Sequence, residues 1–394
     1  MKTIAIIGGG ASGLFLACSL SAKHNVILFE RGERLGRKLA ATGNGQGNIT
    51  NLAVREKGYF TSERNELSKI KEIVRAYDHE SLKGFFAELG VSLFADERGR
   101  VYPTGRQASA LLDALRFSLA EKNTNVKLCS MITSIEKKGE KFLLRLEKET
   151  YQADAVVICV GGKAAKNFGT DGNGYALAKS FGHTVSELNP SLVQLKTDTT
   201  STKTLKGIRV SDGVLRCCLD EKEISIRGDV LFTEYGISGD ATFRLSAFLA
   251  DRTGEGLCVY ADFLPQLLEG EIRELVDKKR KAFPSLAKEE WLFGIVNNQI
   301  GRAILKLSKG DLEKAVKLVK NFPLTVKGSL GFDYAQVTKG GVLLSEVDEN
   351  LQSKKIKGLY FAGEILDVDG ECGGFNLQWA YSSARAVATV LDRE

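Results

Sequence analysis

The stretch TIAIIGGGASG at residues 3–13 constrains the fold more than any other part of this 394-residue chain. Its apolar run at residues 4–7 is typical of a parallel strand buried on both faces. A glycine-rich turn follows at once, and the spacing of apolar residues after the turn predicts a helix. The run VILFE at residues 26–30 predicts the next strand. Strand, turn, helix and strand together predict the first βαβ unit of a parallel sheet.

The glycines of this turn have the spacing that binds a dinucleotide. Gly8 permits the tight turn, Gly10 lets the backbone approach a pyrophosphate, and Gly13 lets the helix pack on the strand. The start of the helix offers free N–H groups to the phosphates. Glu30 closes the second strand, where its carboxylate suits ribose hydroxyls and repels a 2′-phosphate. We therefore predict FAD or NAD at this turn.

The segment RGERLGRKLAATGNGQGNITN at residues 31–51 favours FAD over NAD. Simple NAD dehydrogenases continue with another βα unit here, whereas this chain runs through cationic residues into glycine and asparagine. Glycines at positions 43, 45 and 47 let the backbone lie against a flat ring. Asn44 and Asn48 offer polar edges to that ring.

Two later stretches support the same prediction. Residues 359–363 predict a strand, and a C-terminal helix is expected from about residue 376. Gly373 and Gly374 allow close approach to that helix, whose dipole favours negative charge on a reduced flavin. Glu364 is placed to reach a ribityl hydroxyl. The buried strand AVVICVGG at residues 155–162 is expected to return towards the pyrophosphate, and Ile132 is expected near the adenine.

The predicted cofactor site draws on residues from both ends of the chain. Its members are Gly8, Gly10, Ala11, Ser12, Gly13, Glu30, Arg31, Arg37, Lys38, Thr42, Gly43, Asn44, Gly45, Asn48, Ile132, Gly161, Gly162, Gly363, Glu364, Gly373, Gly374, Asn376 and Leu377.

Several motifs resemble one flavoprotein family, the group related to bile-acid reductases of the BaiN type and to aminoacetone oxidases. They are the two N-terminal segments above, FTEYGISG at 232–239, VTKGG at 337–341 and GLYFAGEILDVDGECGGFNLQWAYSS near the C-terminus. The resemblance spans essentially the whole chain. It implies FAD, a discontinuous FAD domain, and an inserted β-rich domain that carries a helical subdomain.

The chain departs from the usual family pattern at four positions. Gln46 and Gly47 stand where a basic residue and a cysteine are common, and Glu234 and Asp240 stand where histidine and proline are common. These exchanges remove reactive side chains. The resemblance therefore supports FAD but does not transfer a substrate.

The middle of the chain predicts a different architecture from its ends. Residues about 191–268 alternate apolar and polar positions as half-buried antiparallel strands do, and the next segment shows helical spacing. We expect an α/β fold with a Rossmann-type, glutathione-reductase-like FAD-binding domain and an inserted barrel-like domain. The expected boundaries are 1–190 with 336–394 for the FAD domain, 191–268 with 324–335 for the β-rich domain, and 269–323 for the helical subdomain.

The distribution of charge, the length of the apolar runs and the spacing of the cysteines restrict the partners, the location and the metal sites that we expect. The net charge is +6 with acidic and basic residues interleaved, so nucleic acid is not expected as a partner. No apolar run is long enough to span a membrane, and glycines 8–10 interrupt the only signal-like stretch. Seven dispersed cysteines without a CxxC pair predict reduced thiols, a cytoplasmic location and no metal site.

These features predict an FAD-dependent oxidoreductase that acts on a small-molecule substrate by hydride transfer at flavin N5. The favoured reaction is reduction of an activated C=C bond with NAD(P)H as a transient donor, although no second dinucleotide fingerprint is present. The alternatives are an FAD oxidase of a small amine or aminoketone that produces H₂O₂, a tRNA-modifying flavoprotein, and a flavin-binding sensor without turnover.

The substrate is expected between the inserted domain and the flavin face, since pockets favour domain interfaces. Tyr235, Ser238 and Cys372 are the candidates for lining it or for catalysis. The sequence does not identify the substrate, the catalytic acid or base, the preference between NADH and NADPH, or the oligomeric state.

Overall fold

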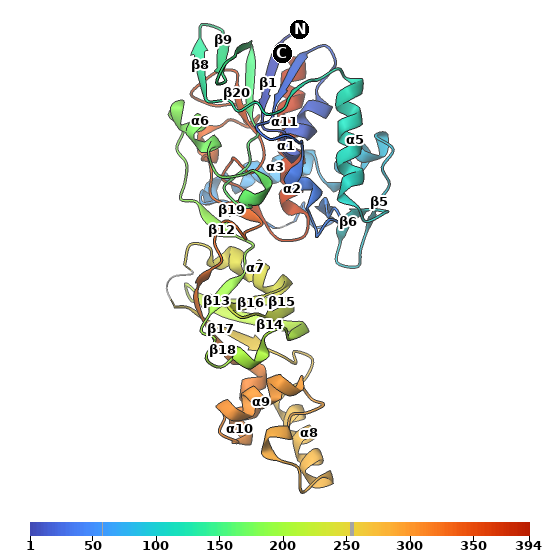
Figure 1. Cartoon of the computed structure of the whole chain (residues 1–394), viewed down its shortest axis with the longest axis vertical. Coiled ribbons are helices and arrows are strands. Elements are labelled where there is room, and N and C mark those ends of the chain that lie inside the picture. The colour runs from blue at the N-terminus through green and yellow to red at the C-terminus, as the bar shows by residue number, and fades with distance from the viewer. Residues whose placement is uncertain (57, 253–255) are drawn as a thin grey trace. The chain divides into compact units, whose positions relative to one another are not determined.

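The computed structural model describes residues 1–56, 58–252 and 256–394. The chain forms two compact units, coloured by residue number in Figure 1. The larger unit comprises Met1–Asn189 and Gln336–Glu394, and the inserted unit comprises Pro190–Ala335. The larger unit is thus built from both ends of the chain, and Lys2 and Glu394 form an ion pair of 2.7 Å within it.

A five-stranded parallel sheet forms the centre of the larger unit. Its strand order is β20-β11-β1-β2-β7, and all four pairings are parallel. The continuous apolar runs predicted this sheet, because a parallel strand needs apolar side chains on both faces. The fold class predicted from the sequence is confirmed. The strands are β1 (Thr3–Ile7), β2 (Asn25–Phe29), β7 (Asn125–Lys127), β11 (Ala155–Ile158) and β20 (Leu359–Phe361).

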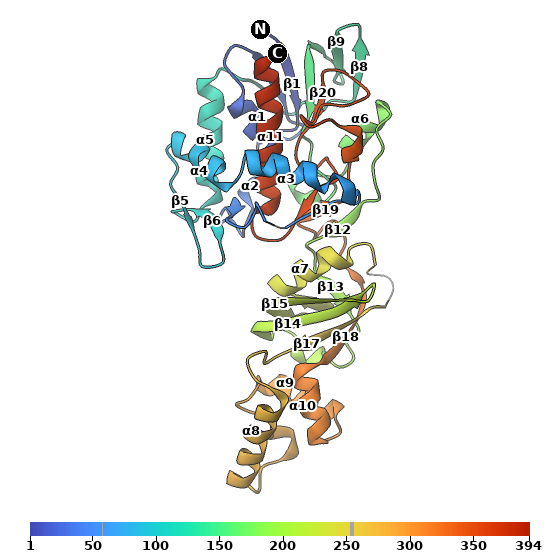
Figure 2. The same ribbon diagram turned by 180° about the vertical axis from the view of Figure 1, so that it is seen from behind.

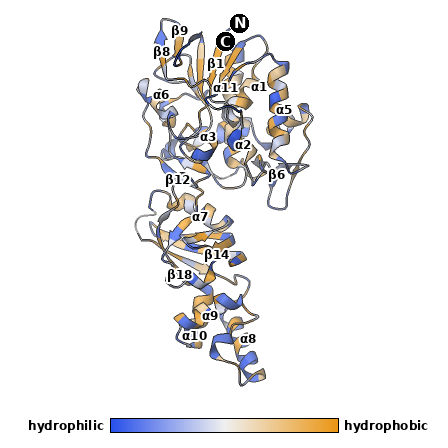
Figure 3. Cartoon of the chain, viewed as in Figure 1, coloured by the Kyte–Doolittle hydropathy of each residue, from blue (hydrophilic) through white to orange (hydrophobic). Residues whose placement is uncertain are grey.

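Helix α1 (Ala11–Ser19) is buried on almost every side. It contacts β1 and β2 and also two further helices, α5 (Ala108–Glu121) and α11 (Phe375–Arg393). Its residues 12–18 are therefore all buried, and Figure 3 shows β1, beside it, in the hydrophobic colour. Because α11 ends the chain and α1 nearly begins it, the two termini of the sequence share one core.

The remaining helices of this unit surround that core. Phe15 of α1 packs edge-on against Phe85, Phe86 and Tyr381, which joins α1 to α4 and α11. Figure 2 shows α3 crossing in front of α11, and the two helices are in contact. The helices are α2 (Arg37–Ala40), α3 (Leu67–Ala76), α4 (His79–Glu88) and α6 (Gly174–Ser180).

Short strands complete the larger unit in small sheets. One meander has the order β10-β9-β8, one sheet has the order β3-β6-β5, and β4 pairs with β21. The meander begins at Ser134, the first residue of β8. The strands are β3 (Thr50–Asn51), β4 (Tyr59–Phe60), β5 (Leu93–Ala95), β6 (Arg100–Pro103), β8 (Ser134–Lys138), β9 (Lys141–Arg145), β10 (Thr150–Ala153), β19 (Val337–Lys339) and β21 (Asp369–Gly370). Strand β12 (Asn189–Ser191) begins with the last residue of the unit's first segment, and its other two residues belong to the inserted unit.

The inserted unit contains a closed barrel of order β13-β16-β15-β14-β17-β18. Alternation places Leu215 and Cys217 of β14 inside and Cys218 outside, as period-two strands require. The strands are β13 (Leu195–Thr197), β14 (Arg209–Leu219), β15 (Lys222–Phe232), β16 (Gly236–Ser238), β17 (Cys258–Asp262) and β18 (Phe322–Ser329). The helices are α7 (Asp240–Leu249), α8 (Glu269–Ala282), α9 (Asn298–Leu307) and α10 (Leu312–Lys320).

Two observations concern the predicted membrane behaviour and location of the protein. Among the described residues, no helix combines the length and the apolar character needed to cross a bilayer. Cys18, Cys129, Cys159, Cys217, Cys218 and Cys258 are free thiols. The cytoplasmic location stays a prediction.

Candidate cofactor site

The first glycine-rich turn contains two kinds of glycine. A Cβ on Gly13 would lie 1.9 Å from the carbonyl oxygen of Gly8, and a Cβ on Gly8 would lie 2.5 Å from that of Cys159. The fold itself therefore excludes a side chain at both positions. A Cβ on Gly10 would meet no atom within 4 Å. Gly10 also precedes α1 without a side-chain cap, so the first turn of α1 is left open to a ligand.

Glu30 is fixed beside this turn by backbone hydrogen bonds. Its Oε2 accepts a hydrogen bond of 2.8 Å from the N–H of Gly9, and its Oε1 accepts one of 2.7 Å from the N–H of Gly32. The segment that leads to Ile132 also lies beside Glu30, because the N–H of Ser130 donates to the carbonyl of Glu30 over 2.8 Å. The structure thus brings the predicted ribose acceptor and the predicted adenine contact together.

Two of the predicted cationic residues are engaged by the loop that follows β11. Arg31 pairs with Asp171 over 3.0 Å, and Arg37 donates to the carbonyl of Asn167 over 2.8 Å. Partial burial opposes ionisation of Asp171, but the hydrogen bonds from Arg31 and the backbone outweigh it and hold the pKa of that carboxyl below its usual range. These two arginines therefore fasten the loop to the cofactor region.

Lys38 and Glu364 meet although 326 positions separate them. Lys38 Nζ lies 2.8 Å from Glu364 Oε2, and Glu364 Oε1 accepts a 2.9 Å hydrogen bond from the N–H of Thr338. A Cβ on Gly162 would lie 2.4 Å from Thr338 Oγ1, so this glycine allows the close approach. The hydroxyl of Thr338 also accepts from the N–H of Lys163 over 2.8 Å.

Thr338 is a residue that the sequence prediction missed. It lies in the VTKGG stretch, which had entered only through the family resemblance. Nearby, Gly161 has a left-handed φ of 73°, as expected for a tight turn after β11. Thr338 and the paired glycines at positions 161 and 162 thus connect both ends of the chain.

The glycine–asparagine segment at residues 43–48 is a compact turn. Gly43, Asn44, Gly45 and Gly47 all have positive φ. A Cβ on Gly45 would meet nothing within 4 Å, and the carbonyl of Gly45 accepts a 2.8 Å hydrogen bond from the N–H of Ala108. The turn therefore rests on the start of α5 and has one open face.

The side-chain amide of Asn48 donates to backbone carbonyls. Its Nδ2 donates to the carbonyls of Thr50 and Val101, over 3.1 Å each, and the side chain is buried. Thr42 likewise donates through its hydroxyl to the carbonyl of Lys38 over 3.2 Å. Both residues shape the turn, whereas exposed Asn44 is open to solvent.

The loop before α11 meets the same region from the other end of the chain. Asn51 Nδ2 donates to the carbonyl of Gly373 over 3.0 Å. A Cβ on Gly374 would lie 2.3 Å from the carbonyl oxygen of Thr50, so only glycine fits there. Gly374 precedes α11 without a side-chain cap. The structure thus brings the two glycine-rich segments into contact.

Three other predicted residues brace this loop and its helix. Asn376 Oδ1 accepts from the N–H of Gly370, and its Nδ2 donates to the carbonyl of Gly370, both over 2.8 Å. The N–H of Gly363 donates to Ser383 Oγ over 2.9 Å. A Cβ on Gly363 would lie 1.9 Å from Ser12 Oγ, and Leu377 is partly buried against the core.

One buried hydroxyl near Glu364 lacks a hydrogen-bond partner within the described chain. Tyr175 is 4% exposed and its hydroxyl makes no hydrogen bond there. Burial raises the pKa of Tyr175, and the charges of Glu364 and Asp367 add to that effect. An orphaned buried hydroxyl close to the carboxylate of Glu364 fits a polar ligand. The residues present fit FAD.

The candidates for the substrate site lie in different units. Ser238 is buried in β16, where its carbonyl accepts from the hydroxyl of Thr242 over 2.8 Å. The carbonyl of Tyr235 accepts from the N–H of Thr197 over 3.0 Å. Cys372 belongs to the larger unit.

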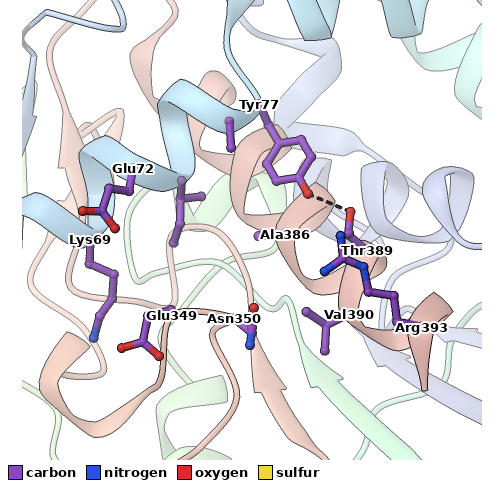
Figure 4. Close-up of a pocket in the computed structure, with 11 residues that line it drawn as sticks. Lys69, Glu72, Tyr77, Glu349, Asn350, Ala386, Thr389, Val390 and Arg393 are labelled. Atoms are coloured by element: carbon purple, nitrogen blue, oxygen red, sulfur yellow. Dashed lines mark hydrogen bonds between the residues drawn. The ribbon is translucent and has the colours of Figure 1, made fainter.

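A pocket of about 230 Å³ lies elsewhere in the larger unit (Figure 4). Lys69, Glu72, Glu349 and Arg393 give it mixed charge, and none of the predicted cofactor residues lines it. It does not belong to the candidate site.

Comparison with known proteins agrees with this geometry. The model of the HI0933-like protein Rossmann domain family matches residues 2–390. The 3-dehydro-bile acid delta(4,6)-reductase of Clostridium scindens is 34% identical over 402 residues, which covers 97% of each chain. Ribosomal RNA dihydrouridine synthases are also similar. That of Haemophilus influenzae is 29% identical and covers 99% of this chain and 98% of its own, and that of Escherichia coli is 28% identical and covers 98% and 97%.

A solved structure supports the fold. The 3-ketosteroid delta1-dehydrogenase of Sterolibacterium denitrificans, in complex with 1,4-androstadiene-3,17-dione, aligns with a TM-score of 0.53 at 14% identity. The alignment covers 100% of this chain and 99% of that one. At this identity the likeness concerns the fold alone.

The prediction that excluded nucleic acid as a partner is wrong. Two relatives that match the chain nearly end to end are ribosomal RNA dihydrouridine synthases. The prediction failed because it required a contiguous basic block, whereas cations far apart in the sequence can gather on one folded surface.

The resemblance identified from the motifs is confirmed by the family match and by these relatives. The open turn of α1, the fixed Glu30 and the joined glycine-rich segments agree with the cofactor that it implied. The chain belongs to the HI0933-like family and is an FAD-dependent oxidoreductase.

Proposed function

We propose that the protein reduces a carbon–carbon double bond conjugated to a carbonyl group in a small organic substrate, with NAD(P)H as the electron donor. The observation that carries this proposal is the 34% identity, over 97% of both chains, to a 3-dehydro-bile acid delta(4,6)-reductase. In a 3-oxo steroid with double bonds at positions 4 and 6, conjugation makes the distal carbon electrophilic. A steroid-like enone or dienone is therefore the proposed substrate class.

The residues of the larger unit would hold the cofactor in this proposal. The open first turn of α1 at Gly10 would hold the diphosphate, and Glu30 would hold the adenosine ribose. Glu364, kept in place by Lys38 and by the N–H of Thr338, would hold the ribityl chain. When bound, the flavin supplies hydride transfer at N5.

Other residues of the chain would tune and line the site. The uncapped start of α11 places a positive dipole end beside Gly373 and Gly374, which favours a negative charge there. Tyr235, Ser238 and Cys372 remain the proposed contacts of the substrate.

A uridine in RNA is the second candidate substrate. Two relatives at 29% and 28% identity are ribosomal RNA dihydrouridine synthases. The C5=C6 bond of uridine is conjugated to its C4 carbonyl, so its reduction is the same class of reaction. The two candidates differ in the substrate and share the chemistry.

Anaerobic stopped-flow absorbance tests the reductase. We expect NADH or NADPH to bleach the purified holoenzyme, and a 3-oxo-4,6-diene steroid acid to restore the oxidised spectrum with loss of one double bond. Rapid reoxidation by O₂ with H₂O₂ and no consumption of the enone would instead support the oxidase. No reduction by either nicotinamide would support the non-catalytic sensor.

The RNA candidate needs its own assay. An unmodified ribosomal RNA transcript is incubated with holoenzyme and reduced nicotinamide and then digested to nucleosides. Dihydrouridine detected by mass spectrometry supports the RNA substrate, and its absence alongside turnover of the steroid favours the small molecule.

A further inference from the structure

The β5–β6 hairpin carries an arginine packed on two aromatic rings. Phe94 and Tyr102 are cross-strand partners, with ring centroids 6.0 Å apart and an interplanar angle of 30°. The guanidinium carbon of Arg106 lies 4.9 Å from each ring centroid. Both contacts are within the range of a cation–π interaction, so the two rings hold the guanidinium in one place.

Hydrogen bonds fix Arg106 further. Its Nη1 donates to Gln46 Oε1 over 3.0 Å. Its backbone has a positive φ of 48°, and its N–H donates to the carbonyl of Pro103 over 2.8 Å. The side chain of Arg106 is thus ordered before any ligand binds.

The charge of Arg106 is not neutralised by a carboxylate within the described part of the chain. The neighbouring Arg100, by contrast, pairs with Asp96 over 2.7 Å. Arg106 is also exposed. An exposed guanidinium that is held by rings and an amide, and not by an acid, keeps donors for an oxyanion.

The hairpin lies against both glycine-rich segments of the candidate site. Gln46, which accepts from Arg106, belongs to the turn at residues 43–48. On the other side, Arg100 pairs across the strands with Asn51, whose side chain donates to the carbonyl of Gly373. Arg106 therefore borders the region proposed to receive the flavin ring.

We propose that Arg106, held over Phe94 and Tyr102, binds an anionic group of the substrate. The group is a carboxylate or phosphate oxyanion that the planar guanidinium meets with two N–H donors. The inference rests on the proposed function for the identity of the reacting double bond, and it adds a charged anchor on the same molecule. Pre-ordering by the rings lowers the entropy lost on binding.

Arg106→Gln in the holoenzyme tests this anchor, with Arg98→Gln as the matched control. Arg98 is exposed in the turn of the same hairpin and carries the same charge, with no ring contact or ion pair within the described residues. The substrates are a 3-oxo-4,6-diene steroid acid and its neutral methyl ester. We expect R106Q to raise KM for the acid about tenfold, with kcat and the KM for the ester unchanged, and R98Q to change neither.

Equal effects on acid and ester, or equal effects of R106Q and R98Q, would overturn the proposal. R106K keeps the charge but loses the planar fork, and an intermediate KM for the acid supports the anchor. FAD content and melting temperature are measured for each variant. If R106Q does not fold, R106K alone is compared with R98K, and equal KM values for the acid again overturn the proposal.

A binding measurement separates this inference from the proposed function. Cholate, which has a carboxylate but no reducible double bond, is titrated calorimetrically into holoenzyme. Weaker binding to R106Q with no reduction of any enone would refute the proposed function and support the anchor. A uridine-containing RNA hairpin serves as the phosphate arm, and a loss confined to RNA identifies the oxyanion as phosphate. Unchanged binding of both probes overturns the anchor.

Discussion

The turn at residues 8–13 and the turn at residues 43–48 are both rich in glycine, but the glycines serve different purposes in the two turns. In the first turn, a side chain at Gly8 or Gly13 would clash with backbone atoms, so both positions require glycine. In the second, positive φ is the main requirement, and Gly45 has no neighbour within 4 Å of where a Cβ would lie. Gly10 resembles Gly45 in its empty surroundings but has an ordinary extended backbone.

The comparison teaches that a glycine in a motif serves either the fold or a ligand. The atoms that an added Cβ would meet distinguish the two cases, because a glycine of the fold is surrounded by protein atoms and a glycine that faces a ligand is not. Gly13 serves the fold, and we propose that Gly10 serves the ligand, although only three positions separate them. Substitutions at these positions should therefore separate stability from FAD content.

Gly13→Ala should have the largest effect. The added methyl would lie 1.9 Å from the carbonyl oxygen of Gly8, and backbone cannot yield as a side chain can. We expect a loss of about 4 kcal/mol or more in the free energy of unfolding, as for severe overpacking. Urea denaturation followed by circular dichroism measures it. A change below about 1 kcal/mol would contradict the assignment of Gly13 to the fold.

Gly10→Ala should lower FAD content with little change in apoprotein stability. The position has φ −79°, which alanine adopts readily, and open space around the methyl. We expect the unfolding free energy of the apoprotein to change by less than about 0.5 kcal/mol. FAD affinity should fall more than about tenfold, because the methyl takes the place of a phosphate oxygen. Fluorescence titration of apoprotein with FAD measures the affinity, and unaltered affinity would show that Gly10 faces no diphosphate.

Gly45→Ala should have a smaller effect on stability. The left-handed φ of 81° costs alanine about 1 kcal/mol, and no steric clash adds to it. Thermal unfolding of the apoprotein gives the backbone strain, and the FAD dissociation constant shows whether a ring rests on this face. An affinity equal to that of wild type would place Gly45 with the fold glycines.

Glu346→Gln provides the smallest comparison, at a residue of the larger unit that is not among the predicted cofactor contacts. Partial burial would raise the pKa of Glu346, but Lys355 and the N–H and hydroxyl of Thr184 outweigh it and lower the pKa to about 2. Because the folded pKa lies below the usual 4.5, this group stabilises the protein above about pH 4.5. That stabilisation is lost as the pH falls towards 2.

The wild type should therefore lose more stability than E346Q between pH 5 and about pH 2.5. Melting temperatures across this range, corrected for FAD content, check it. Parallel curves for the two proteins would show that Glu346 contributes nothing to the acid sensitivity.

The first βαβ unit was predictable because its determinants are contiguous. Its strands are continuous apolar runs, Gly13 packs against the carbonyl of Gly8, and the N–H of Gly9 donates to Glu30, 21 positions away. The barrel was predictable from alternation. The candidate site was outlined in the sequence by glycines that follow strands, and the structure brings two of its expected members, Lys38 and Glu364, together.

The pairings within the site were not predictable. Lys38 and Glu364 were both expected at the cofactor, and only folding shows that they pair with each other. Asn48 was expected to face the flavin, but two backbone carbonyls hold its amide inward. Arg106 gave no signal, because β5 and β6 are three and four residues long and show little alternation. Its setting depends on contacts with residues up to 60 positions away.

The parallel sheet has a consequence for the order in which the protein matures on the ribosome. Strand β11 pairs with β1 on one side and with β20 on the other, and α1 contacts the C-terminal helix α11. During synthesis, β11 emerges with one edge unpaired and α1 emerges without its covering helix until residues 359–393 have followed. The nascent N-terminal half thus exposes an unpaired strand edge, which can pair with another chain, and an apolar helix face. The exposure lasts for the translation of some 200 further codons, which takes about 10 to 40 seconds at ordinary elongation rates. Chaperone capture of ribosome-bound intermediates should be concentrated in that interval.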